Sequence, residues 1–281
     1  MKDKLDSVYR EEDIEILVST MNRDSLDFLI PMFPFCHFSK FSILIINQTE
    51  SSKLLISNYP NIRAINSFEK GLSKSRNLAI SNAKGKILVI ADDDVAYQTD
   101  FSSKIINAFN RFQDAVAINF CAVKSNGCYI KKYPSDSKTK LNTFDIFNVS
   151  SIEMTLNKAI LDKAEVQFDE NFGLGAAFEM GEEAVFLFDL KKKMMKIVFE
   201  PQIIVKHEAL TTSEKTSEIE RYYIMGALLT RIFKNYFIFW LAIKLFFDLK
   251  QYKLSIINLM SVLRSAKQGH KKIVEIRNEN K

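Results

Sequence analysis

The chain has 281 residues, of which 47% are hydrophobic and 26% are charged. This length and apolar content can build one large domain, or one domain with an appendage, and they exclude a disordered protein. The charged first 13 residues lack the apolar stretch of a signal peptide, so we expect a cytoplasmic protein. Disulfide frameworks and zinc sites are not expected either, because there are only three irregularly spaced cysteines, Cys36, Cys121 and Cys128.

The net charge of +5 is unevenly distributed along the chain. From Arg231 to Lys281 there are 11 Lys or Arg residues against 3 Asp or Glu, whereas the preceding part has 28 basic and 31 acidic residues. The basic character therefore belongs to the tail. No zinc-finger spacing, recognition-helix pattern or glycine-aromatic RNA motif accompanies it, so we expect no nucleic-acid partner.

Short segments rich in Ile, Val and Leu alternate with segments of helical periodicity over the first 120 residues. Predicted strands cover 14–19, 41–47, 62–66, 86–91 and 115–121, and predicted helices cover 24–31, 73–83 and 100–112. This alternation predicts an α/β fold with an open, mainly parallel sheet and helices on both faces. Ligands of such sheets bind at the carboxyl ends of strands. Polar residues at these predicted ends are Thr20, Asn22, Asn47 and Asp92 to Asp94.

Three adjacent carboxylates, Asp92, Asp93 and Asp94, follow the apolar run 87–91 directly. Neighbouring acids repel by about 4 kcal/mol at about 4 Å in an effective dielectric near 20. A divalent cation would relieve this repulsion, and oxygen ligands completed by a phosphate suit Mg²⁺ or Mn²⁺. The trio therefore predicts a metal site, with a solvated turn after a strand as the alternative.

No glycine-rich phosphate loop of the usual kinds occurs in the chain. The segment 71–77 opens a predicted helix, where free N–H groups and the cations of Lys74 and Arg76 could face a diphosphate. An ordinary capped surface helix is the alternative interpretation.

A second acidic cluster, Glu182 and Glu183, follows a glycine-containing segment and begins a predicted helix that ends at 191–193. Acids at the start and lysines at the end also match ordinary helix design. Adjacent side chains diverge by about 100° around a helix, so we expect at most one glutamate to point into a cleft. His207 ends a further strand-like run, where it could be a ligand or a structural residue.

In their order and spacing these motifs resemble the family 2 glycosyltransferases of the GT-A fold. The resemblance begins at Ile16-Leu17-Val18-Ser19-Thr20-Met21-Asn22-Arg23 and continues through 71–77 and 83–86 to Ala91-Asp92-Asp93-Asp94, which looks like the family's DxD element. It resumes at 168–170 and 181–183 and closes at Pro201 and His207. Enzymes that build bacterial capsule, exopolysaccharide or lipopolysaccharide O-chains have similar motifs.

The resemblance implies transfer of a sugar from a nucleotide-diphosphate donor, here expected to be a UDP-sugar, to a hydroxyl of a glycan or lipid-linked acceptor, with inversion at the anomeric carbon. It implies Mn²⁺ or Mg²⁺ held by Asp94, Asp92 and His207, and Glu183 as the general base, with Glu182 as the second choice. The implied nucleotide-sugar contacts are Thr20, Asn22, Arg23, Asn47, Lys74, Arg76, Asn77, Asp92 and Asp93.

The sequence departs from the family pattern at two places. Glu183 stands where the family more often has Asp, and Asn47-Gln48 stands where many relatives have an acidic pair near the base or ribose. Two other functions remain open. In a haloacid-dehalogenase-like phosphatase, Asp92 would be the nucleophile and Asp94 the acid-base, although no later paired-aspartate segment follows. An inactive GT-A scaffold in a polysaccharide-assembly complex is the other.

We expect residues 1–215 to form the GT-A catalytic domain and residues 216–281 to form a basic, amphipathic helical tail. The apolar run 236–243 is too short to span a bilayer, because Lys234, Lys244 and Asp248 interrupt it. The tail could lie as a hairpin on anionic lipid at the inner face of the cell membrane. Alternatively, its helices could pack on the catalytic domain or form a homodimer interface.

Overall fold

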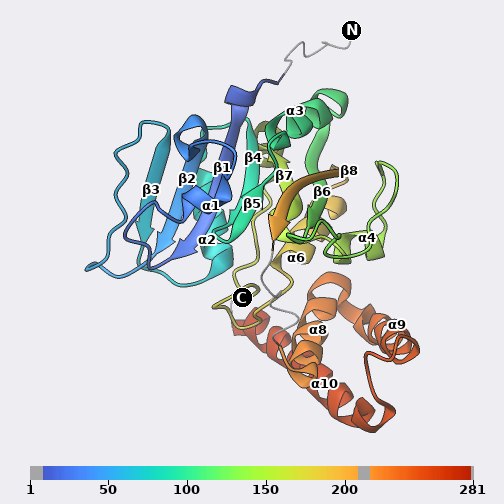
Figure 1. Ribbon diagram of the computed structural model, residues 1–281. Helices are drawn as coiled ribbons and strands as arrows, with labels where there is room; N and C mark the ends of the chain where they lie inside the picture. The colour runs from blue at the N-terminus through green and yellow to red at the C-terminus, as the bar shows by residue number, and fades with distance from the viewer. Residues whose placement is uncertain (1–8, 208–215, 280–281) are drawn as a thin grey trace.

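The computed structural model describes residues 9–207 and 216–279, and its centre is an eight-stranded mixed sheet (Figure 1). The strand order is β3-β2-β1-β4-β7-β6-β8-β5. The strands are β1 (Ile14–Met21), β2 (Ser42–Gln48), β3 (Ile62–Ser67), β4 (Ile87–Asp92), β5 (Val95–Tyr97), β6 (Ala115–Val123), β7 (Met154–Asn157) and β8 (Lys196–His207).

The sheet has a parallel half and a mixed half. Strands β3, β2, β1 and β4 are parallel neighbours, β7 is antiparallel to both β4 and β6, β8 is parallel to β6, and β5 is antiparallel to β8. All five strands predicted from the first 120 residues are present within one or two residues of their expected bounds. The predicted α/β fold with a mainly parallel sheet is therefore confirmed, with β5 and β7 as antiparallel additions.

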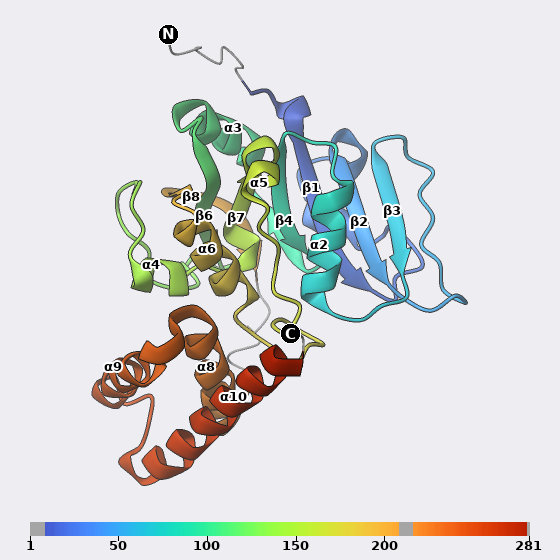
Figure 2. The ribbon, with the colours of Figure 1, turned by 180° about the vertical axis from the view of Figure 1, so that it is seen from behind.

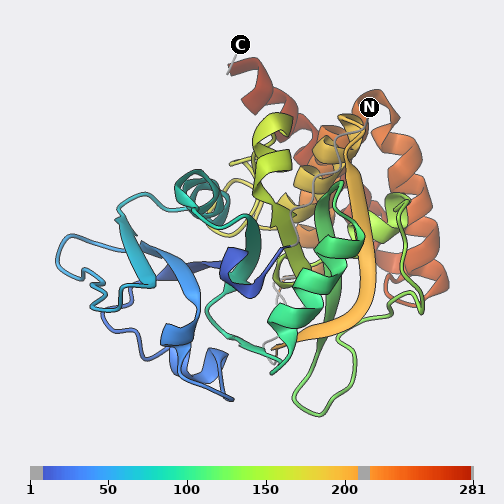
Figure 3. The same ribbon diagram turned by 90° about the horizontal axis from the view of Figure 1, so that it is seen from above.

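Helices cover both faces of the sheet, as Figures 1 and 2 show from opposite sides and Figure 3 from above. One face carries α1 (Leu29–Met32) and α3 (Phe101–Arg111), and the other carries α2 (Leu72–Asn82), α5 (Lys158–Ala164) and α6 (Glu182–Lys192). Successive side chains of β1 point to opposite faces of the sheet. Ile16 and Val18 pack in the hydrophobic core under α1 and α3, and Leu17 packs in the core under α2, α5 and α6. Shorter pieces are α4 (Thr143–Phe147), η1 (Glu11–Asp13), η2 (Phe38–Lys40) and η3 (Ser151–Glu153).

The helix predicted over 24–31 is wrong, because only the four-residue α1 forms there. Tertiary hydrogen bonds hold the preceding segment as a loop. The Asn47 side chain accepts from the Arg23 N–H at 3.0 Å and donates to the Arg23 carbonyl at 2.9 Å, while the Asn22 N–H donates to the Gln48 carbonyl. These bonds satisfy backbone groups that a helix would otherwise pair internally.

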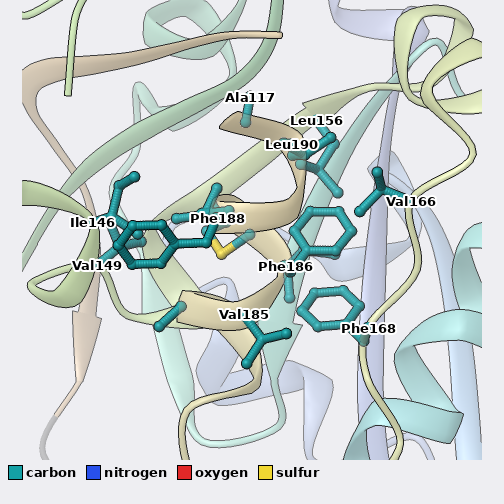
Figure 4. Packing of buried hydrophobic residues seen from close by; sticks show 14 of the residues in the cluster. Ala117, Ile146, Val149, Leu156, Val166, Phe168, Val185, Phe186, Phe188 and Leu190 are labelled. Atoms are coloured by element: carbon teal, nitrogen blue, oxygen red, sulfur yellow. The ribbon is translucent and has the colours of Figure 1, made fainter. Parts of the chain in front are cut away.

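Helix α6 packs in the hydrophobic core on the face of the sheet that also carries α2 and α5, where Figure 4 shows Phe186 facing Phe168. The two rings stack at 4.3 Å between centroids, with an interplanar angle of 9°. Val185, Phe186, Leu187 and Leu190 are all fully buried, so the helix is anchored along most of its length. This packing fixes the start of α6, which carries both glutamates of the second acidic cluster.

The C-terminal helices form a lobe below the sheet in Figure 1. They are α8 (Glu218–Phe233), α9 (Phe237–Lys250) and α10 (Leu259–Glu279), with η4 (Lys234–Tyr236) and η5 (Ile256–Asn258) between them. Helix α8 joins the core of α6 through Leu228 and Ile232. It crosses α10 so closely that a Cβ at Gly226 would lie 1.9 Å from the Ala266 carbonyl oxygen.

Packing of the tail on the rest of the protein, one of the two alternatives, is therefore present for α8 and α10. The predicted domain boundary after residue 215 stays a prediction, and residues 208–215 lie outside the described part. Among the residues described, no helix combines the length and apolar character needed to cross a bilayer.

Candidate active site

Polar residues from three strands meet at the carboxyl edge of the parallel half-sheet. In the registers of β1, Thr20 pairs with Asn47 of β2 and Ser19 pairs with Asp92 of β4. The predicted grouping of these strand ends is therefore present. The three aspartates at the end of β4 then take three different sets of partners.

Asp93 is held at the end of β1. It accepts hydrogen bonds from the Thr20 hydroxyl and from two nitrogens of Arg23, Nε at 3.0 Å and Nη2 at 2.8 Å. The Arg23 side chain is 42% exposed, so its guanidinium lies at the mouth of this edge. Thr20, Arg23 and Asp93 thus form one hydrogen-bonded group, as three of the predicted nucleotide-sugar contacts.

Asp94 lies beside His207. Its Oδ1 is 3.3 Å from the His207 Nε2, and β5 and β8 enforce this proximity because Val95 pairs with His207. The Asp94 side chain is 49% exposed, which leaves it accessible to a ligand. Within the described residues, no group of three His, Cys, Asp or Glu side chains converges as a metal cage. A carboxylate and an imidazole nevertheless fit Mg²⁺ or Mn²⁺, since such ions use few protein ligands and complete their shell with substrate phosphates and water.

Asp92 points to a different cation, Arg76 of α2. Its Oδ1 accepts from Arg76 Nη2 at 3.0 Å, and Arg76 Nη1 donates to Glu182 Oε1 at 2.7 Å. Burial raises the pKa of Asp92, while the Arg76 charge opposes that rise. The Asp94 charge is also near enough to raise the pKa of Asp92, and a metal shared by Asp92, Asp94 and His207 stays a prediction.

Arg76 is the buried centre of the site, with 2% of its side chain exposed. Its guanidinium also lies over the Phe168 ring, 5.6 Å from the centroid. Removing one member of a buried ion pair typically costs about 3–5 kcal/mol, because the partner is left as an uncompensated charge. Arg76 therefore ties the first acidic motif, at Asp92, to the second, at Glu182, which is 106 residues from Arg76 along the chain.

The two glutamates at the start of α6 differ in their surroundings. Glu182 is paired with Arg76, whereas the Oε2 atom of Glu183 is buried with no hydrogen-bond partner in the described part of the chain. Burial and the neighbouring Glu182 charge raise the pKa of Glu183 to about 8. The Arg76 charge attracts both glutamates.

At the start of α2, groups that could bind an anion already have partners within the protein. The Leu72 N–H donates to the Leu174 carbonyl at 2.9 Å, and Lys74 pairs with Glu69 at 2.7 Å. The Asn77 amide binds the Phe168 backbone in both directions, at 2.8 and 2.9 Å. These contacts favour the capped-helix interpretation and give Asn77 a structural role beside the site.

Sequence reasoning missed the residues that hold this half of the site in place. Arg231 of α8 binds Asp169 and Asp189 at 2.6 Å each, and so fixes α6 and the segment before it. At the first residue before α6, Gly181 has φ +94° and its Cβ position lies 3.0 Å from Leu228. An arginine within a largely apolar helix was the available signal for Arg231.

Comparisons with known proteins agree with this architecture. Residues 37–165 match the model of glycosyl transferase family 2. The crystal structure of S. aureus TarS 1–349 in complex with UDP-GlcNAc has a TM-score of 0.54 at 16% identity, covering 79% of this chain and 66% of that one. TarS 1–349 alone has a TM-score of 0.52 at 14% identity, covering 79% and 65%. A longer S. aureus TarS chain has a TM-score of 0.54 at 15% identity, covering 79% and 40%.

The chain thus spans less than two thirds of the length of each of these TarS structures. No curated protein matches the sequence significantly. Likeness at such low identity establishes the fold, and the match over 37–165 shows similarity to the family for that segment. Together, these comparisons show that the chain has the GT-A fold of the TarS structures, and that its residues 37–165 are similar to glycosyl transferase family 2.

Proposed function

We propose that the chain is a metal-dependent inverting glycosyltransferase that uses a UDP-sugar. The observation that best supports this function is the buried Arg76 bridge between Asp92 and Glu182. It brings a donor-side acidic motif and a base-bearing helix to the same edge of the sheet. S. aureus TarS shares the fold, and its structure has been solved with UDP-GlcNAc and with UDP. This supports a uridine nucleotide in the donor.

The donor would bind across the carboxyl ends of β1, β2 and β4. Thr20, Arg23 and Asp93 supply a hydroxyl, a cation and a carboxylate at this edge for the ribose and diphosphate. Asp94 and His207 would hold Mn²⁺ or Mg²⁺. When bound, the metal supplies positive charge for the departing diphosphate.

Glu183 would act as the general base. The acceptor hydroxyl gives its proton to the Glu183 carboxylate as its oxygen bonds to the anomeric carbon from the face opposite the diphosphate. The bond from that carbon to the diphosphate oxygen breaks, and its electron pair leaves with the nucleotide. A carboxylate with a raised pKa is a stronger base than an ordinary glutamate. Glu182, neutralised by Arg76, would position Glu183.

The acceptor would be a glycan or lipid-linked hydroxyl in bacterial surface polysaccharide synthesis, with the enzyme in the cytoplasm. No observation favours the phosphatase alternative, because its nucleophile would be Asp92, which is paired with buried Arg76. The inactive-scaffold alternative is decided by a transfer assay.

Thermal-shift measurements with UDP, GDP, CDP and dTDP, each with and without Mn²⁺, test the donor site. A nucleotide at about 100 times its Kd stabilises the fold by about 2.7 kcal/mol. We expect UDP to raise the melting temperature most, and only with metal. Asp94→Ala should abolish the UDP shift, whereas Asp114→Ala, a surface control, should retain it. A full shift in Asp94→Ala, or none in the unmodified protein with any nucleotide, would contradict the donor-site assignment.

The base is tested separately from the donor site. Glu183→Gln should keep the UDP shift and lower sugar transfer by at least about 10²-fold, the lower range for general-base catalysis. Donor hydrolysis serves as the assay while the acceptor is unidentified. Near-normal turnover in Glu183→Gln would remove Glu183 as the base and leave the donor site unaffected.

A further inference from the structure

Exposed apolar side chains are concentrated on the C-terminal helices. Of the 21 large hydrophobic residues that are exposed in the described chain, 11 lie between residues 218 and 279. That segment is less than a quarter of the chain, so the concentration is not a property of the whole surface. Contiguous apolar surface of this kind marks a binding site for protein or membrane.

Helix α9 is apolar on two opposite sides. Its inner side packs against α8 and α10 through Phe237, Leu241 and Leu245. Its outer side borders a shallow hollow lined, together with Phe144 of α4, by Phe239, Ala242, Ile243, Phe246 and Phe247. Phe239 and Phe246 are among the exposed hydrophobic residues. The Phe144 ring contacts Phe247 at 6.0 Å between centroids, so the outer side is an apolar face that α4 covers only in part.

The charges that interrupt α9 in the sequence do not lie on this outer face. Lys244 pairs with Asp248 at 2.6 Å, and Asp248 also accepts a hydrogen bond from the Tyr222 hydroxyl of α8 at 2.7 Å. Asp248 is buried. Its position on the α8 side leaves the opposite side of the helix to hydrophobic residues.

The connection from α9 to α10, residues 251–258, continues the apolar surface at its far end. We call these residues, with Met260, the hairpin tip. Tyr252 is 96% exposed and Ile257 is 90% exposed, and Ile256 and Met260 are also exposed. Leu254 is buried in the helical core, and the Lys253 N–H donates to the Asp248 carbonyl at 2.9 Å, so the turn is anchored. Figures 1 and 2 show the tip at the end of the lobe farthest from the sheet.

Basic residues outnumber acidic ones around the hairpin tip, where the Glu218 carboxylate of α8 accepts a hydrogen bond from the Asn258 amide at 2.8 Å. From 249 to 274 the sequence has six basic residues and no acidic one. The basic residues are Lys250, Lys253, Arg264, Lys267, Lys271 and Lys272, and all six are exposed. Exposed aromatic and aliphatic groups flanked by lysines are the composition of an interfacial element that binds anionic lipid.

We propose that the hairpin tip and the outer face of α9 dock on the surface of an anionic phospholipid bilayer. The hydrophobic side chains enter the interface, and the lysines contact lipid phosphates. This docking is distinct from transfer chemistry, and none of its residues belongs to the donor site. A second copy of this chain would be expected to supply acids against the lysines. Residues 249–274 contain no acid, and the Glu218 carboxylate beside the tip is already bonded to Asn258, so a second tip would offer fewer acids than the six basic residues require.

Vesicle flotation of the full chain tests the proposal, with neutral phosphatidylcholine and with vesicles containing 30% phosphatidylglycerol, about the anionic fraction that attracts basic segments. We expect association with the anionic vesicles only, weakened by salt. Replacing Ile256 and Ile257 by Ser should lower the partition coefficient at least about tenfold. The matched control replaces two equally exposed residues of the catalytic lobe, Ile56 and Met194, by Ser and should leave it unchanged.

The charge component has its own pair of variants. Replacing Lys250 and Lys253 by Gln should lower partitioning about fivefold per lysine, the equivalent of about 1 kcal/mol each. Replacing Lys40 and Lys53, which are exposed elsewhere, should have little effect. The UDP thermal shift of every variant reports the donor site independently.

Three outcomes would overturn the proposal. The unmodified chain could fail to float with anionic vesicles, or the control variants could lose as much vesicle binding as the tip variants. Light scattering could instead show a dimer that does not bind vesicles and that the Ile256 and Ile257 substitutions dissociate. That result would assign the surface to a second copy.

Discussion

The Glu183→Gln substitution should stabilise the protein while it abolishes transfer, and the stabilisation should depend on pH. Burial and Glu182 raise the pKa of Glu183 from 4.5 to about 8, so the native state binds this proton more tightly than the unfolded chain does. Stability contributed by this group is therefore greatest below about pH 4.5 and is lost as pH rises towards 8. Gln cannot ionise, so the variant escapes this loss.

The magnitude follows from the pKa difference, since a change of one in pKa corresponds to about 1.4 kcal/mol. Near pH 8 the ionised Glu183 lowers the free energy of unfolding by at most about 4 kcal/mol, and near pH 4.5 by almost nothing. For a chain of this size, about 1 kcal/mol corresponds to about 2–4 °C in melting temperature. Glu183→Gln should therefore melt several degrees higher than the unmodified protein at pH 8 and at almost the same temperature at pH 5.

Calorimetric melting of both proteins at intervals from pH 5 to 8 measures this difference. The control is Glu179→Gln, an exposed glutamate just before α6, which should show no pH-dependent gain. A Glu183→Gln protein that is less stable at pH 8, or more stable by the same amount at every pH, would refute the assignment of a strained, raised-pKa carboxylate. A catalytic group that costs stability is a common trade-off at active sites.

Three further predictions concern catalysis and the C-terminal helices. Because Glu183 must be ionised to accept a proton, kcat/KM for transfer should rise with pH up to about 8 and then level, as a pH–rate profile would show. Arg231→Met should lower the free energy of unfolding in urea by about 1–3 kcal/mol, because Asp169 would lose its cation while Asp189 keeps only Lys192; an unchanged free energy of unfolding would contradict the half-buried bridge. Gly226→Ala should separate α8 from α10 and raise the protease sensitivity of the C-terminal lobe, and unchanged digestion would argue against the close crossing.

Much of the parallel half-sheet could be predicted because its strands are buried on both faces. Such strands appear in the sequence as continuous apolar runs, and 87–91 of β4 is an example, with five buried residues before Asp92. Parallel strand ends share an edge, so the approach of Thr20, Asn47 and Asp92 follows from the topology alone. Strand β7 was missed because four residues, Met154–Asn157, are too few for a periodic pattern.

The partners of the charged side chains could not be predicted in the same way. A cation near the start of α2 is a local feature, but Arg76 pairs with Asp92 and with Glu182, which is 106 residues away. The sequence pattern suggested either a diphosphate as the anion near Arg76 or an ordinary capped surface helix. The split of the aspartate trio among Arg76, Arg23 and His207 likewise depends on tertiary contacts.

The C-terminal helices and α6, which carries the proposed base Glu183, pack against each other. Arg231 of α8 forms an ion pair with Asp189 of α6 at 2.6 Å. Leu228 of α8 lies against Gly181, directly before the two glutamates, where an added Cβ would be 3.0 Å from it. The hairpin tip is therefore joined through packed helices, α8 and α10, to the start of α6. Docking of the tip on a bilayer would set the orientation of Glu183 relative to the lipid surface. A soluble acceptor has no need of such a fixed orientation, whereas a hydroxyl on a lipid-linked glycan does, so lipid docking and a lipid-linked acceptor support each other.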